Sequence, residues 1–164
     1  MTVYVEHCFS PVFDNHSRLL ILGTMPSPAS REQGFYYSHP RNRFWAVMTA
    51  VTGAETCPQT PEEKRAFALA HRFALWDVLR GCEIEGASDA SIRQPVPNNL
   101  DTVLSVAPIE AICTTGGTAL RLYRQFNRER SVPVIALPST SPANARMPLE
   151  ELIEHYECLR EYLR

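Results

Sequence analysis

The stretch Arg18-Leu19-Leu20-Ile21-Leu22-Gly23 decides the fold class, because a short apolar run ended by glycine is typical of a buried parallel strand. Similar apolar runs return at 73–79, 109–115 and 132–137. Between these runs, apolar residues recur at helical spacing or follow a helix-capping residue. The helices predicted in this way cover 42–51, a segment that begins near Thr60, 99–104, 117–128 and 148–163. Strands therefore alternate with helices along the chain.

This alternation predicts an α/β protein, a three-layer αβα fold with a central, mostly parallel four-stranded sheet. No linker or internal repeat interrupts the pattern, so residues 1–164 are expected to form a single domain. The polar segment 81–97 is expected to be a connecting loop. In sheets of this kind, ligands bind beyond the carboxyl ends of the strands. The segments that leave those ends are 23–43, 79–97, 114–118 and 138–146.

Composition and charge exclude several classes of protein. No apolar run approaches the roughly 18 residues of a membrane span, and residues 1–7 lack the pattern of a secretory signal. We therefore expect a cytoplasmic protein with no membrane partner. The net charge of −2 does not by itself indicate nucleic acid, although all basic residues except Lys64 are arginines, which suit bidentate phosphate contacts. The scattered cysteines and histidines lack metal-ligand spacing, so neither a metal nor another cofactor is expected.

Two of the segments beyond the strands carry side chains that suit a planar, phosphorylated ligand. The first runs from Gly23 to Trp45 and offers backbone amides, three adjacent aromatic residues at 35–37, and Asn42 at the start of a helix. Aromatic rings can sandwich a planar base, and an asparagine offers a donor and an acceptor to a base edge or to a water. The second segment, 137–146, offers hydroxyls and amides just after a strand, which suits a phosphate.

Two motifs in these segments resemble motifs of a known family. Gly23-Thr24-Met25-Pro26-Ser27 and His39-Pro40-Arg41-Asn42-Arg43-Phe44-Trp45 are similar to Gly-Ile-Asn-Pro-Gly and His-Pro-Ala-Asn-Arg-Phe-Trp of the mismatch-specific branch of the uracil-DNA glycosylase superfamily. Residues 137–146 resemble that branch's Leu-Pro-Asn-Pro-Ser-Gly-Leu-Ser-Arg, with one extra residue. The resemblance covers nearly the whole chain and implies a DNA repair enzyme that acts on a flipped base.

One position departs from that branch. There the asparagine of Gly-Ile-Asn-Pro holds the hydrolytic water, whereas this chain has Met25, whose thioether is only a weak acceptor and cannot orient a water. With Tyr36-Tyr37 and a Ser-Thr-Ser-Pro-Ala-Asn loop at 139–144, the chain looks more like the DNA-deoxyinosine (hypoxanthine-DNA) glycosylases, in which a downstream asparagine serves catalysis. The resemblance therefore implies a glycosylase that flips hypoxanthine out of DNA and hydrolyses its N-glycosidic bond in base excision repair.

The resemblance also implies roles for individual residues. Asn42 takes the catalytic role, holding either the water or a base edge, and Tyr37 stacks on the flipped base. The base-binding residues are Gly23, Thr24, Met25, Pro26, Ser27, Tyr37 and His39. The DNA-binding residues are Ser139, Thr140, Ser141, Ala143, Asn144, Arg146 and Arg41. Lys64 is expected on a surface helix far from both segments, so no Schiff-base step is expected and the enzyme is monofunctional.

Several of these residues also have a purely structural interpretation. Asn42 is suited to cap the helix that follows it, and Tyr36 and Tyr37 are suited to pack the loop onto the domain. Phe44 and Trp45 lie on a helix face with Val47 and Met48, so they are expected in the core. Asp77 and Asp89 have no partner that the sequence identifies, and both are expected to be solvated or to cap a helix.

Other functions stay open at this level. One is a uracil or mismatch glycosylase of the parent branch, which would need a group other than Met25 to hold the water. Another is a relative that binds damaged or single-stranded DNA without cleaving it. A flavodoxin-like nucleotide enzyme is disfavoured, because the chain has neither a P-loop nor Gly-x-Gly-x-x-Gly. In each glycosylase interpretation the expected partner is double- or single-stranded DNA with a deaminated base, and the protein is expected to be a monomer.

Overall fold

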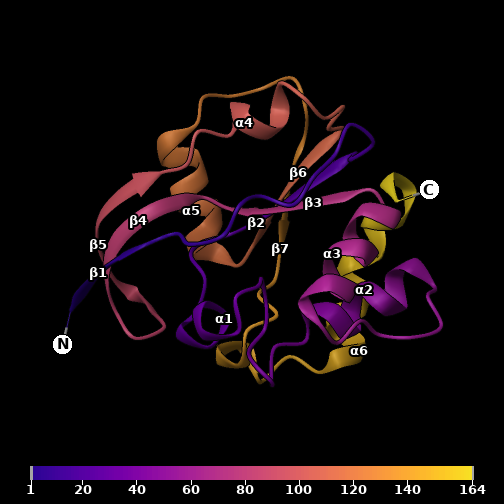
Figure 1. Cartoon of the computed structure of the whole chain (residues 1–164), viewed down its shortest axis with the longest axis horizontal. Coiled ribbons are helices and arrows are strands. Elements are labelled where there is room, and N and C mark those ends of the chain that lie inside the picture. Colours follow the sequence, from indigo (N-terminus) through magenta and orange to yellow (C-terminus); the bar gives the residue numbers. More distant parts are fainter. Residues whose placement is uncertain (1, 164) are drawn as a thin grey trace.

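Four parallel strands form the central sheet of the computed structural model, which describes residues 2–163 (Figure 1). In spatial order they are β3 (Phe73–Asp77), β2 (Leu19–Gly23), β6 (Ala111–Thr115) and β7 (Val134–Leu137). Every residue of β2 and β3 is buried, as expected for parallel strands covered on both faces. The prediction of a four-stranded sheet from the apolar runs is confirmed, and this sheet is parallel throughout.

Helices cover both faces of this sheet, which confirms the three-layer αβα architecture. Figure 1 shows α4 and α5 on one side of the strands, and α2, α3 and α6 on the other. Their bounds are Phe44–Thr52 for α2, Pro61–Ala70 for α3, Asp101–Leu104 for α4, Gly117–Phe126 for α5 and Leu149–Tyr156 for α6. The capping box at Thr60, in which its hydroxyl and the Glu63 carboxylate satisfy each other's backbone N–H groups, explains why α3 begins where the sequence predicted.

The layers enclose one apolar core. Phe44, Met48 and Phe73 are fully buried, and Trp45 is nearly so, which confirms the expectation for Phe44 and Trp45. Each large apolar side chain buried in this way contributes on the order of 1.5–3 kcal/mol to folding. The start of α2 is therefore fixed from inside the protein, and the polar residues just before it are held in place.

A second, antiparallel sheet was not predicted. It has the order β1-β4-β5, with β1 at Val3–Glu6, β4 at Leu79–Glu85 and β5 at Ser88–Pro97. The prediction that 81–97 is a connecting loop is therefore wrong. No residue of β5 is buried, so β5 lacks the alternation of apolar and polar residues that marks a strand in the sequence. Its strand conformation depends on pairing with β4, which sequence periodicity does not report.

Smaller differences occur at the helices. A short helix, α1 (Pro28–Gln33), lies in the predicted loop after β2 and begins at Ser27, whose hydroxyl accepts the Ser30 N–H. The predicted helix 148–163 is divided into α6 and a 3₁₀ segment, Glu157–Tyr162. Within residues 2–163, no helix is both long enough and apolar enough to cross a membrane.

Candidate active site

A cleft of about 870 Å³ lies beyond the carboxyl ends of the four parallel strands. The last residue of each strand lines it: Gly23 of β2, Asp77 of β3, Thr115 of β6 and Leu137 of β7. The chain passes from β2 to β3 on one side and later to β6 on the other, so the cleft lies at the switch point where such sheets bind ligands. All four segments predicted to follow these strands contribute to the lining.

Nearly all the residues singled out from the sequence lie together in this cleft. Its lining includes every one of them except Arg41 and Arg146, which are exposed and lie outside the lining. The cleft also contains polar residues that sequence reasoning did not select: Ser30, Asp77, Ser88, Asp89, Thr115 and Thr118. The two sequence segments therefore form adjoining parts of one site, and the strand ends complete it.

Asn42 is held in one orientation by two hydrogen bonds. Its Oδ1 accepts the backbone N–H of Phe44 at 2.9 Å and the hydroxyl of Thr140 at 2.8 Å. A backbone N–H can only donate, so the atom facing it must be the oxygen of the carboxamide. Both lone pairs of Oδ1 are then used, while the Nδ2 amide group has no hydrogen-bond partner among residues 2–163. What Asn42 offers to the cleft is a free N–H donor.

Tyr37 presents an aromatic ring to the same cleft. Its backbone lies in the left-handed region at φ 52°, an uncommon conformation for a residue with a side chain. One face of the ring stacks on Phe44, with centroids 4.0 Å apart and planes 17° apart. Burial raises the pKa of the Tyr37 hydroxyl, and the nearby Asp77 carboxylate raises it further. Tyr37 is therefore a neutral, rigidly backed ring, suited to stacking and unsuited to acting as a base.

Arg43 joins the two sequence segments. Its guanidinium donates to the backbone carbonyls of Met147 and Asn144, and its backbone N–H donates to the Thr140 carbonyl at 3.1 Å. Thr140 is 1% exposed, and its hydroxyl is committed to Asn42. The Thr140 hydroxyl is thus not free to hold a DNA phosphate as the sequence suggested. Arg43, which the sequence analysis did not select as a site residue, fixes the two walls of the cleft relative to each other.

The serines of the second segment retain free hydroxyl protons. Ser139 Oγ accepts the Ser141 N–H, and Ser141 Oγ accepts the Ala143 N–H, both at 3.1 Å. Neither hydroxyl donates to another group within residues 2–163, and a serine hydroxyl can donate once while it accepts. Asn144 is partly committed, because its Nδ2 donates to the Ser139 carbonyl at 2.9 Å. The loop is therefore held rigid by its own contacts and still offers two donors to the cleft.

Gly23 lies where no side chain would fit. A Cβ added there would lie 2.6 Å from Asp77 Oδ1, 3.2 Å from the Tyr37 hydroxyl and 3.6 Å from Thr115 Oγ1. After Gly23, the backbone N–H groups of Met25 and Ser27 have no hydrogen-bond partner among the described residues. Three polar side-chain atoms thus gather around Gly23 at the floor of the cleft, and two of the lining residues that follow keep backbone N–H groups that are unpaired within residues 2–163.

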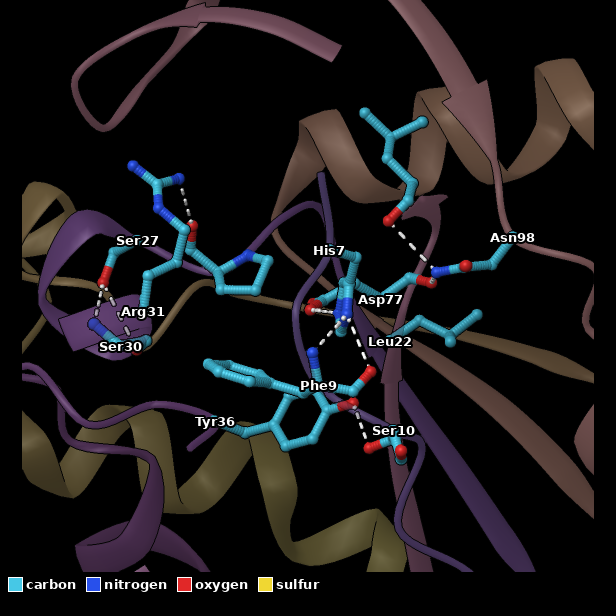
Figure 2. Close-up of polar contacts among 12 residues, drawn as sticks. His7, Phe9, Ser10, Leu22, Ser27, Ser30, Arg31, Tyr36, Asp77 and Asn98 are labelled. Atoms are coloured by element: carbon cyan, nitrogen blue, oxygen red, sulfur yellow. Dashed lines mark hydrogen bonds and ion pairs between the residues drawn. The ribbon is translucent and has the colours of Figure 1, made fainter. Parts of the chain in front are cut away.

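Asp77 is the most unexpected member of this floor. It is only 3% exposed, and its Oδ2 lies 2.7 Å from Nε2 of His7, which follows β1 (Figure 2). The expectation that Asp77 is solvated or caps a helix is therefore wrong. The backbone around it is fixed as well, since the Asn98 amide donates to the Asp77 and Leu79 carbonyls. An acid at the end of an apolar strand, beside the glycine of the neighbouring strand, was the signal that could have revealed it.

The turn between β4 and β5 forms another part of the lining. Residues 86–89 reach the cleft from the antiparallel sheet, and Asp89 is exposed there. Partial loss of water at the cleft raises the pKa of the Asp89 carboxyl, and the Asp77 carboxylate raises it further. No group of three or more metal-ligating side chains lies close enough within residues 2–163 to hold a metal ion.

Comparison with known proteins assigns this architecture to a family. The model of the family described as the uracil DNA glycosylase superfamily matches residues 10–163. The chain belongs to the uracil DNA glycosylase superfamily.

Two relatives of this chain share one protein name with each other. The chain is 32% identical to a protein named hypoxanthine DNA glycosylase from Methanosarcina acetivorans, over 87% of this chain and 90% of the relative. It is 28% identical to a protein of the same name from Methanosarcina barkeri, over 84% and 87% of the two chains. A solution NMR structure from M. acetivorans, described as a candidate uracil DNA glycosylase, superposes with a TM-score of 0.83 at 28% identity, covering 98% of this chain and 99% of that one.

The position of Lys64 differs from the one expected from the sequence. Lys64 was expected far from both segments, but its Nζ lies 3.5 Å from Ser38 Oγ in the first segment and 5.7 Å from the centre of the Trp45 ring. Burial lowers the pKa of its ammonium group. Lys64 is nevertheless not among the residues that line the cleft.

Proposed function

We propose that this protein is a monofunctional DNA glycosylase that removes hypoxanthine from deoxyinosine in base excision repair. The observation that carries the proposal is the free Nδ2 donor of Asn42, held beside a rigid stacking ring at the switch point of the sheet. Superfamily membership and the two relatives named hypoxanthine DNA glycosylase support it. The reaction adds water to C1′ of the sugar and releases the base, with both N-glycosidic electrons leaving on the base.

The flipped base is bound first by stacking. Phe44 covers one face of the Tyr37 ring, so the base stacks on the other, and its six-membered ring faces the floor at Gly23. The unpartnered N–H groups of Met25 and Ser27 are suited to donate to O6 of hypoxanthine. Met25 and Pro26 form the wall of this subsite, and His39, whose Nδ1 accepts the Arg41 N–H at 3.0 Å, lies at its entrance.

Bond cleavage places negative charge on the departing base and positive charge on the sugar. An N–H donor aimed at the base stabilises that transition state more than the ground state. Because both lone pairs of Asn42 Oδ1 are already used, Asn42 is better suited to donate to the base than to orient the attacking water. Of the two roles that the sequence allowed for Asn42, we therefore favour the base edge.

The DNA strand is held by the second segment. Ser139 and Ser141 donate hydroxyl protons to phosphate oxygens beside the flipped nucleotide, and the exposed Arg41 and Arg146 contact phosphates outside the cleft. Ala143 and Asn144, at the edge of the cleft, are the residues placed to fill the gap left in the base stack. All these groups come from one chain, so we propose that the monomer is sufficient for activity.

The test uses end-labelled duplexes that contain one deoxyinosine, one deoxyuridine or no lesion, with abasic sites revealed by alkali. Wild type should release hypoxanthine, and strand cleavage should require the alkali. Asn42→Ala should lower the single-turnover rate by roughly 100-fold or more while DNA binding persists. Asn99→Ala is the matched control, because Asn99 Oδ1 makes the same kind of cap, to the Asp101 N–H, outside this cleft.

Asn42→Asp separates the two roles of Asn42. This variant keeps an oxygen for the Phe44 N–H and the Thr140 hydroxyl but replaces the free donor by an acceptor. If Asn42 donates to the base, the variant should be as impaired as Asn42→Ala; if Asn42 holds the water, the variant should retain activity. Release chiefly of uracil would move the protein to the mismatch branch, and lesion binding without any release would make it a non-catalytic relative.

A further inference from the structure

We propose that the Asp77 carboxylate, held by His7, selects the base by accepting the ring N–H that deamination creates. This inference rests on the proposed glycosylase function and names the group that determines its specificity. Asp77 lines the cleft at the end of β3 and was not part of either sequence motif. His7 lies outside residues 10–163, the part of the chain that the superfamily model matches.

The position of Asp77 places one oxygen under the edge of a stacked base. Asp77 Oδ1 and the Tyr37 hydroxyl lie 2.6 Å and 3.2 Å from the same point above Gly23. A ring stacked on Tyr37 therefore extends its edge over Oδ1, which makes no hydrogen bond within residues 2–163. Asp77 is only 3% exposed, and a base stacked on Tyr37 would cover Oδ1, so an incorrect base would leave this carboxylate oxygen without a partner.

The other oxygen of Asp77, Oδ2, is already hydrogen-bonded to His7. Its Nε2 lies 2.7 Å from Oδ2, and the two side chains are 2% and 5% exposed. Nδ1 of His7 lies 3.0 Å from the Phe9 carbonyl and 3.2 Å from the Phe9 N–H, so the ring has a partner there whether Nδ1 donates or accepts. Because a carboxylate can only accept, the 2.7 Å contact is an N–H donation from Nε2 to Asp77 Oδ2. Phe9 and Tyr36 pack around the imidazole and fix its plane (Figure 2).

The donor and acceptor pattern of the bases then decides what fits. Hypoxanthine has an N1–H donor beside the O6 acceptor, which matches Asp77 Oδ1 and the backbone N–H groups of Met25 and Ser27. Adenine presents a lone pair at N1 and an amino group at C6, so both contacts are reversed and N1 faces a carboxylate. Polar mismatches of this kind in buried sites discriminate strongly, because the groups of the site are left unpaired.

The contact between His7 and Asp77 also disfavours the binding of guanine. Guanine has the same N1–H and O6 as hypoxanthine, with an additional amino group at C2. A carboxylate with both oxygens free would accept N1–H and the C2 amino group together, and so would favour guanine. With Oδ2 committed to His7, Asp77 offers a single acceptor, which is all that hypoxanthine requires. His7 is thus a positioning residue that acts through Asp77.

The first test measures inhibition of hypoxanthine release by free bases. For the wild type, free hypoxanthine should inhibit at concentrations at least roughly tenfold lower than adenine. In Asp77→Asn the His7 N–H would hold the amide oxygen and leave the amide NH₂ facing the cleft, where it can pair with N1 of adenine. The variant should lose most of the preference or reverse it. Asp101→Asn, at an exposed acid paired with Arg130, is the control and should keep the wild-type ratio.

The second test uses guanine as the competing base. His7→Ala frees Oδ2 and should increase inhibition by guanine relative to hypoxanthine by roughly tenfold. His7→Gln retains a side-chain N–H donor and should restore much of the wild-type ratio, which a merely structural role for His7 would not predict. Thermal unfolding verifies that each variant is folded.

The outcomes separate this inference from the proposed function. A wild type that releases no hypoxanthine overturns the function and this inference together. A wild type that releases hypoxanthine but is inhibited equally by adenine overturns the inference alone, without any variant. A folded Asp77→Asn with the wild-type adenine ratio also overturns the role of Asp77. A folded His7→Ala with the wild-type guanine ratio overturns the role of His7.

Discussion

The two sheets of this protein contribute to the same cleft in different ways. The parallel sheet is buried and ends at the floor of the cleft, where Gly23, Asp77 and Thr115 lie. In the antiparallel sheet β4 packs on the core, whereas β1 and β5 have no buried residue; residues 86–89 at the β4–β5 hairpin form one part of the lining, and the segment after β1 supplies His7. We expect changes in the parallel sheet to affect both turnover and base selection, because Gly23 and Asp77 belong to it. Changes in the antiparallel sheet and the segment after β1 should affect selectivity or DNA affinity alone.

Among changes within the two sheets themselves, the largest effect is expected for Gly23→Ala, at the end of the parallel sheet. The added Cβ would lie 2.6 Å from Asp77 Oδ1, so the carboxylate must move out of the base subsite. We expect single-turnover hypoxanthine release to fall roughly 100-fold, with a loss of about 1–3 kcal/mol in the free energy of unfolding. Gly53→Ala is the matched control, because the strain at its φ of 75° destabilises the protein away from the cleft and should leave activity intact.

Tyr37→Ala removes the stacking surface and should have the next largest effect. Stacking on an aromatic ring contributes about 1–3 kcal/mol per base, which corresponds to roughly a 5- to 150-fold loss in hypoxanthine release. Tyr37→Phe keeps the ring and loses only a long contact to Thr115 Oγ1, so it should stay within roughly threefold of wild type. Equal impairment of both variants would mean that the hydroxyl, and not the ring face, is what the site needs.

Arg43→Lys tests the connection between the two walls of the cleft. Lysine keeps the charge but cannot reach the Met147 and Asn144 carbonyls with the fork geometry of arginine. We expect a loss of about 1–2 kcal/mol in stability, measured by denaturant unfolding, and a fall of roughly tenfold in hypoxanthine release, since Thr140 and Asn42 would no longer be held together. Arg124→Lys, on the exposed face of α5, should change neither quantity.

The smallest effect is expected at the tip of the antiparallel hairpin. Asp89→Asn removes a negative charge from the lining of the cleft that we propose receives the DNA, so the Kd for a deoxyinosine duplex should fall about twofold at low salt and less at high salt. The single-turnover rate at saturating protein should stay unchanged, and Glu154→Gln on α6 serves as the control. A loss of turnover as large as that of Gly23→Ala would abolish the functional distinction between the two sheets.

The same contrast explains what the sequence could reveal. The apolar runs around Leu20 and Leu75 indicate buried parallel strands, so the central sheet was predictable. The position of the cleft followed from the sheet, because such sheets bind ligands beyond the carboxyl ends of their strands. Asn42 and Tyr37 were found through motif resemblance. β5 was missed because it has no buried residue to produce a pattern.

Two features of the site itself could not be predicted in this way. The pairing of His7 with Asp77 joins residues 70 positions apart, and no local pattern records such a contact. The committed oxygen of Asn42 depends on Thr140, a residue 98 positions away. The hydrogen bonds of the folded site determine which donor and acceptor atoms are available to a ligand. The residue types alone do not reveal this.

The attachment of His7 has a consequence for how such enzymes can change. His7 follows a four-residue strand whose side chains are mostly exposed, while its own ring is buried and packs on Phe9 and Tyr36. Substitutions that change how this segment holds His7 would therefore alter which damaged base is accepted through contacts that lie outside the four parallel strands. A new substrate range would then be open to this scaffold through a few changes in β1 and the residues after it, without any change in the parallel sheet itself.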